Sequence, residues 1–194
     1  MKKISAIIVF CFLLASMSIT FAQESSPVPT QKGTYTVAII PYINATEEKQ
    51  DYIKETIDSK YTEQFSNDKF HLASAVDIQK VLSSTGFDAS NMELPEKDVM
   101  ASVAKQTNAD YVIAMELSQL ITTRHMSFFQ AKVVTKTKLR YKFYNAKQDK
   151  IIPFQTTGIS ENKTVFGGVG FKDPIVKALN EAMDNANIKI AENL

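Results

Sequence analysis

Apolar residues recur along the first half of the chain with periods that predict alternating strands and helices. Residues 35–42 are almost continuously apolar, as in a strand that is buried on both faces. In the charged segment that follows, an apolar residue recurs every four positions: Ile53, Ile57, Tyr61 and Phe65. This spacing places them on one side of an amphipathic helix. The pattern therefore indicates an α/β protein.

The middle of the chain continues the alternation. Phe70–Ala73 predicts a second short strand, and a helix near Val76–Ser83 should end before Gly86. Pro95 opens a further helix, and Tyr111–Leu117 is a third, largely apolar strand. The order of elements up to this point is β-α-β-α-α-β, which predicts a sheet with mainly parallel or mixed pairing.

The pattern changes after Leu120 to a period of two. Residues 128–144 alternate between apolar and polar positions, which predicts a long, half-buried strand. Ile151–Ser160 predicts its hairpin partner, and Pro153 places that partner at a sheet edge because proline has no N–H to donate. A β-hairpin should therefore follow the α/β half.

The last segment predicts a helix that packs on the sheet. Asp173 is expected to cap its start, with Pro174 at the first helical position. One apolar stripe runs along it: Ile175, Ala178, Leu179, Ala182, Met183, Ala186 and Ile190. The expected fold class is thus α/β (α+β), with a mixed β-sheet in the order β-α-β-α-α-β-β-β-α and helices packed on the sheet. Residues 34–194 should form a single domain.

The N-terminus has the pattern of a secretory signal peptide. Residues 1–22 contain two lysines, an apolar run and a final Thr-Phe-Ala, which predicts cleavage after Ala22; an uncleaved anchor is the alternative. Residues 23–33 are polar and contain proline and glycine, as in a flexible leader. The only cysteine, Cys11, lies inside the signal and too early for lipidation. We therefore expect a bacterial, exported protein, periplasmic or extracellular, that is not lipid-anchored and has no membrane span after cleavage.

Composition excludes several classes of function. Hydrophobic residues make up 44% of the chain and charged residues 22%, as in a globular protein. The two histidines, His71 in a strand and His125 in a predicted loop, lack metal-ligand spacing and a nucleophile motif. Gly167–Gly170 lacks the lysine of a phosphate-binding loop, so a hinge is favoured over an anion cradle. We predict no catalytic residue, no cofactor and no metal.

Charge is distributed unevenly along the chain. Residues 23–123 hold 8 lysines against 15 acidic residues, whereas residues 124–194 hold 12 basic against 6 acidic. Five basic residues share one face of the long strand and are the predicted partner-binding residues: Lys132, Lys136, Lys138, Arg140 and Lys142. They have two interpretations. Lysines on an exposed strand prevent edge-to-edge aggregation, or they recognise an anionic protein surface, lipid headgroup or polymer. Nucleic acid is not expected, because the protein is exported.

Three segments carry a resemblance to a known family. They are Val37–Tyr42 with Asn44, Phe70–Leu82 with its Phe-His-Leu-Ala and Asp-Ile-Gln-Lys-Val-Leu sequences, and Ala101–Ile113, in which a helix leads into Ala-Asp-Tyr-Val. Over residues 35–120 the chain resembles the periplasmic domain of the curli secretion channel family (CsgG-like) and its relatives with the TolB N-terminal type of fold. The hairpin and the last helix match only in the order of elements.

The resemblance implies an envelope protein that acts by binding. The chain lacks the lipidation cysteine and the extra membrane hairpins of the channel, which argues against a pore. The first hypothesis is a non-enzymatic interaction or assembly module that binds an envelope protein or itself, head to tail, through its acidic and basic parts. The second is a monomeric binder of an anionic ligand or polymer on the lysine face. An enzyme, with acids such as Asp110 or Glu116, is a third reading.

Overall fold

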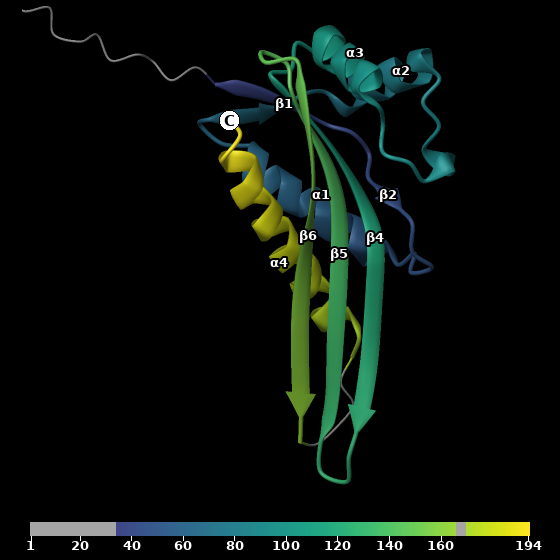
Figure 1. The fold of residues 1–194 in the computed structure, drawn as a ribbon. Coiled ribbons are helices and arrows are strands. Elements are labelled where there is room, and N and C mark those ends of the chain that lie inside the picture. Colours follow the sequence, from purple (N-terminus) through teal and green to yellow (C-terminus); the bar gives the residue numbers. More distant parts are fainter. Residues whose placement is uncertain (1–33, 166–169) are drawn as a thin grey trace, which may run out of the picture. The chain divides into compact units, whose positions relative to one another are not determined.

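A mixed β-sheet with helices on both faces forms the fold, which confirms the expected class (Figure 1). The computed structural model describes residues 34–165 and 170–194. The strands are β1 (Tyr35–Ile39), β2 (Ile43–Asn44), β3 (Phe70–Leu72), β4 (Tyr111–Met126), β5 (Ala131–Asn145) and β6 (Lys150–Thr164). The helices are α1 (Asp51–Phe65), α2 (Ala75–Thr85), a short 3-10 helix (Ala89–Asn91), α3 (Lys97–Thr107) and α4 (Lys172–Ala191).

The strands lie in the order β3-β1-β4-β5-β6, and β2 pairs with β4 beside this path. β1 is parallel to both β3 and β4, whereas β4, β5 and β6 form an antiparallel meander. The helical connections β1-α1-β3 and β3-α2-α3-β4 permit the parallel pairs, and the short turns permit the antiparallel ones. β6 is an edge strand, as Pro153 predicted, and β5 is an internal strand.

One face of the sheet is covered by α1 and α4. The four residues spaced along α1, from Ile53 to Phe65, are all buried, as predicted. The whole predicted stripe of α4 is also buried against this face. Tyr141 and Phe143 of β5 meet them from the sheet. This layer is the larger hydrophobic core of the domain.

The opposite face is covered by α2 and α3 over part of its area only. Ile78 of α2 and Val103 of α3 pack on β1, on Val112 of β4 and on Tyr144 of β5. The local sequence sets the ends of both helices. α2 begins after Ser74, whose hydroxyl accepts the N–H of Asp77, and ends at Gly86 with φ +70°, a conformation that glycine adopts without strain.

The last helix also closes one edge of the sheet. Gly158 of β6 lies directly against α4, where a Cβ would come within 2.0 Å of the Ala178 carbonyl oxygen. Along the same edge, the Ile159 N–H donates to Glu181 at 3.0 Å, and Asn185 donates to the Thr157 carbonyl at 2.9 Å. Side chains of α4 thus satisfy backbone groups that an edge strand would leave open.

Three sequence predictions need correction. The third strand runs to Met126 rather than Leu117, because residues 119–126 pair with β5, so His125 lies in a strand and not in a loop. Asp173 does not cap α4, since the helix begins at Lys172 and the capping position, Phe171, makes no side-chain hydrogen bond. The strand expected over residues 128–144 begins only at Ala131, because residues 127–130 form the turn that joins it to β4.

The structure leaves some expectations untouched. The predicted signal peptide, the leader and most of the Gly167–Gly170 loop lie outside the described residues. Among the residues that are described, none of the helices combines the length and the apolar character needed to span a membrane. Within the same residues, the acidic and histidine side chains form no group of three that could hold a metal ion.

Candidate partner-binding face

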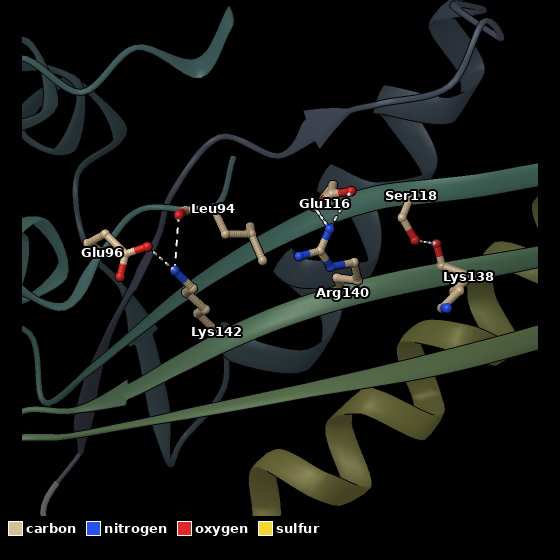
Figure 2. Close-up of polar contacts among 7 residues, drawn as sticks. All are labelled: Leu94, Glu96, Glu116, Ser118, Lys138, Arg140 and Lys142. Carbon is tan, nitrogen blue, oxygen red and sulfur yellow. Dashed lines mark hydrogen bonds and ion pairs between the residues drawn. The ribbon is translucent and has the colours of Figure 1, made fainter. Parts of the chain in front are cut away.

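The five predicted basic residues lie on the sheet face that α2 and α3 cover only in part. Tyr144, at the end of β5, is buried beneath these helices. Alternation along the strand places the side chains two, four, six and eight residues before it on the same face, and Figure 2 shows three of them, Lys142, Arg140 and Lys138. The register places residues of β4 and β6 beside each of them. Their surroundings differ, and the differences separate structural residues from free ones.

Lys142 ties the sheet to the segment before α3. Its ammonium donates to the Leu94 carbonyl at 3.1 Å and to Glu96 Oε1 at 2.9 Å (Figure 2). Only 20% of its side chain is exposed. Because its charge is already satisfied within the fold, Lys142 acts as a structural clamp.

Arg140 neutralises a buried carboxylate. Glu116, its partner on β4, has a side chain that is only 5% exposed. Arg140 Nη1 donates to Glu116 Oε1 at 3.4 Å and lies 3.1 Å from Oε2. A carboxylate removed from water is costly unless a cation accompanies it. Arg140 is therefore held by the fold, and Glu116 is its counterion rather than a free catalytic acid.

Lys132 forms an ion pair with Glu161 on β6, and Lys163 contacts the same carboxylate. Hydrogen bonds from Lys132 and then Lys163 hold the pKa of Glu161 below its ordinary value. This group lies close to the turn between β4 and β5, since Lys132 is the second residue of β5. Three of the five predicted residues thus have acidic partners within the chain.

Lys136 and Lys138 remain available. Neither ammonium group has an ion pair or hydrogen bond to any described residue, and Figure 2 shows only the backbone carbonyl of Lys138 in contact, with Ser118. They are two residues apart on β5, so their Cα atoms are separated by about 7 Å. The two side chains therefore present a compact pair of positive charges on the same face.

Apolar and uncharged side chains flank the two lysines. The register places Lys136 between Ile121 of β4 and Ile159 of β6, which are 47% and 56% exposed. Lys138 lies between Gln119 and Thr157 in the next row. We call these six residues the open-face patch: Gln119, Ile121, Lys136, Lys138, Thr157 and Ile159. An exposed patch of this mixed character suits a protein interface better than a purely charged face does.

This arrangement changes the two interpretations of the lysines. β5 is hydrogen-bonded on both sides, so its lysines cannot serve to block pairing at its own edges. Ile121 and Ile159 were not among the residues predicted from the sequence. Ile121 lies in the part of β4 that was expected to be a loop, and Ile159 becomes a neighbour of Lys136 only through the register of the sheet.

A concave region, separate from the open-face patch, lies at the carboxyl ends of β1 and β3. Its volume is about 430 Å³ and its lining is largely apolar, with Ile39, Tyr42 and Leu72 among the residues that form it. Its charged residues, Lys54 and Asp58, form an ion pair with each other. Burial raises the pKa of the Tyr42 hydroxyl, with the charge of Asp58 adding to the effect. The tyrosine is thus kept neutral, and this region presents no unpaired acid or base for catalysis among its described lining residues.

Comparisons with known proteins show only distant similarity. No protein-family model and no curated protein sequence matches the chain. Among solved structures, the hypothetical protein CT253 from Chlamydia trachomatis is 16% identical, with a TM-score of 0.47 over 83% of this chain and 95% of that one.

Two lipoproteins are similarly distant. Lipoprotein GNA1162 from Neisseria meningitidis is 10% identical, with a TM-score of 0.46 over 82% of this chain and 99% of that one. The LpoB C-terminal domain from Escherichia coli is 14% identical, with a TM-score of 0.41 over 68% and 86%. Similarity at this level assigns the chain to no family.

Proposed function

We propose that this chain is an exported, non-enzymatic protein of the bacterial cell envelope that acts as an interaction and assembly module, of the kind that the CsgG-like resemblance implies. The signal-peptide pattern predicted for residues 1–22 supports export. The binding surface is the open-face patch. The observation that carries the proposal is that Lys136 and Lys138 have no ion pair among the described residues, whereas the other three basic residues of the strand are paired.

The patch has the two components that an interface needs. Ile121 and Ile159 supply apolar surface, whose burial provides affinity. Lys136 and Lys138 supply charge that selects an acidic partner and accelerates encounter. Since these lysines have no acidic partner among the described residues of their own chain, a carboxylate from another molecule can approach them without displacing an existing ion pair.

A second copy of the chain is the first candidate partner. Asp51 and Glu55 of α1 are exposed and have no ion pair among the described residues, and α1 covers the other face of the sheet. The cationic face of one copy can therefore meet the acidic helix of the next. Such a contact uses two different surfaces and produces rings or filaments.

The experiment that tests this proposal is light scattering coupled to size exclusion, on protein purified after export, at low and high salt. We expect an oligomer that dissociates as salt rises, because exposed charge pairs are screened. Lys136→Glu/Lys138→Glu should abolish it. Arg140 is left intact, because its loss would damage the fold.

The matched control is Lys147→Glu/Lys150→Glu, which makes the same change of charge at two exposed residues at the β5–β6 turn. This control should assemble normally. Combining the Lys136→Glu/Lys138→Glu change with Asp51→Lys/Glu55→Lys should restore assembly. Unchanged assembly of the open-face variant would exclude the open-face patch as the contact, and a monomer at both salt concentrations would overturn self-association.

An anionic ligand or polymer is the second candidate partner. Gln119 and Thr157 beside Lys138 offer hydrogen-bonding groups that could accompany the two charges. For this function we expect a salt-sensitive retention of the monomer on an immobilised anionic polymer, lost in Lys136→Glu/Lys138→Glu. Equal retention of this variant and of the turn control would exclude the patch as the binding site.

A further inference from the structure

A cluster of exposed apolar side chains lies at the turn between β4 and β5. Phe128 is 100% exposed, Phe129 81% and Met126 75%, and the two aromatic rings lie 6.2 Å apart. The turn itself is ordered by hydrogen bonds from the Ser127 N–H and hydroxyl to the Gln130 carbonyl, at 2.8 and 3.1 Å. We call Met126, Phe128 and Phe129 the hairpin tip.

The composition of this turn is unusual for an exposed connection. Turns between strands favour glycine, asparagine, aspartate and proline, which satisfy the backbone and tolerate water. Here the chain places two phenylalanines where they contribute nothing to either hydrophobic core. Figure 1 shows this turn at the end of the meander remote from α2 and α3. Adjacent exposed apolar groups of this kind mark an interaction site.

Basic residues lie immediately behind the tip. The register aligns His125, Lys132 and Lys163 in one row across β4, β5 and β6. Glu161 is the carboxylate that pairs with both lysines, so the end of the meander keeps an excess of positive charge. The row lies about 7–10 Å from the tip along the strands. Apolar groups therefore come first and cations follow at the depth of a lipid headgroup layer.

We propose that the hairpin tip docks on the surface of a membrane that contains anionic lipids, with Phe128 and Phe129 in the interface and Lys132 and Lys163 at the headgroups. From the tip inward, apolar side chains are followed by basic ones, which matches the interface and then the headgroup layer of a bilayer. The positive charge complements anionic lipid. The contact is peripheral. It uses a different part of the sheet from the open-face patch, so its test does not depend on the function proposed above.

An introduced tryptophan can serve as a fluorescence probe without background from other indoles, because the chain contains no tryptophan. Phe128→Trp places a single indole at the tip. With vesicles of phosphatidylglycerol and phosphatidylethanolamine, its emission should shift to the blue and become protected from acrylamide. Val76→Trp, at a residue of α2 that is 78% exposed, is the matched control and should show neither effect. Unchanged emission of the tip tryptophan would overturn the proposal.

Vesicle flotation of the full exported chain separates the two contributions. Phe128→Ser/Phe129→Ser should lower partitioning by roughly tenfold or more, because interfacial binding scales with buried apolar area. Lys132→Gln/Lys163→Gln should lower it by roughly fivefold per lysine. Val76→Ser should have no effect.

Two further results would contradict the proposal. Equal binding to neutral phosphatidylcholine vesicles would exclude headgroup recognition. A change in oligomeric state of the phenylalanine variant without vesicles, combined with normal flotation, would assign the tip to a contact between copies of the chain.

Discussion

Gly158 of β6 lies against Ala178 of α4 so closely that any side chain there would collide with the helix backbone. A Cβ at this position would be 2.0 Å from the Ala178 carbonyl oxygen and 2.7 Å from the Ala182 nitrogen. Backbone atoms cannot move aside as a flexible side chain can. This contact lets α4 approach the sheet edge closely enough for its side chains to cap β6.

Gly158→Ala should therefore destabilise the domain. We expect a loss of about 1–3 kcal/mol or more in the free energy of unfolding, because overpacking forces the helix away from the sheet. Urea denaturation followed by circular dichroism measures it. Gly170→Ala is the control, since a Cβ there has nothing within 4 Å and the change should stay within about 0.5 kcal/mol. Equal losses for the two variants would contradict the close contact.

Removing Arg140 should expose the cost of the buried Glu116 carboxylate. Arg140→Met leaves Glu116, with a side chain 5% exposed, without its cation. We expect a loss of about 1–3 kcal/mol, at the lower end for a buried ion pair because Arg140 itself is half exposed.

The double variant Glu116→Gln/Arg140→Met should recover most of this stability. A double-mutant cycle in urea measures the coupling. Lys136→Met, on the same strand face but without an ion pair among the described residues, serves as the control and should be nearly neutral. A cycle without coupling would show that the two side chains act independently.

Acid should weaken the turn between β5 and β6 through Asp149. Hydrogen bonds from Lys97 and then Tyr144, both at 2.8 Å, hold the pKa of this carboxyl below its ordinary value of 3.8. A carboxyl with a lowered native pKa stabilises the fold above its unfolded pKa, and this contribution disappears as pH falls through the native pKa.

Asp149→Asn should accordingly lower Tm at about pH 6, and this difference should shrink as pH falls through the lowered native pKa of Asp149. Thermal unfolding across this range tests the expectation. Asp68→Asn is the control, because Asp68 is exposed and has no hydrogen-bonded partner in the described part of the chain. A constant difference in Tm at every pH would rule out the titration of Asp149 as its cause.

Much of the fold could be predicted because local patterns and tertiary packing agree. The spacing from Ile53 to Phe65 required one buried helix face, and Gly86 ended α2 by a conformation that few other residues adopt. The distal half of β4 could not be predicted in the same way. Residues 119–126 have apolar side chains on both faces, Leu120 and Ile121 among them, so their strand conformation depends on pairing with β5.

The basic strand face was also predicted only in part. A period of two placed Lys136, Lys138 and Arg140 on the same face, and the register agrees. Which basic residues of the strand are paired depends on Glu161, Glu116 and Glu96, the partners of Lys132, Arg140 and Lys142, which come from three separate segments. No local pattern contains that information. The exposed tip was not predicted, because Phe128 was assigned to the start of a strand, where an aromatic residue is common.

The capping of β6 by α4 also determines how the sheet can grow. Glu181, Asn185 and Lys189 occupy backbone groups along Gln155–Ile159, so a peptide cannot add there as a further strand. At the other end, β3 is only three residues long. On the side of β4 away from β5, no described strand pairs with residues 119–126. In the described part of the chain, the distal half of β4 is therefore the edge that can accept a further strand, and a single such edge permits pairing with one partner and not continuous extension into a fibre.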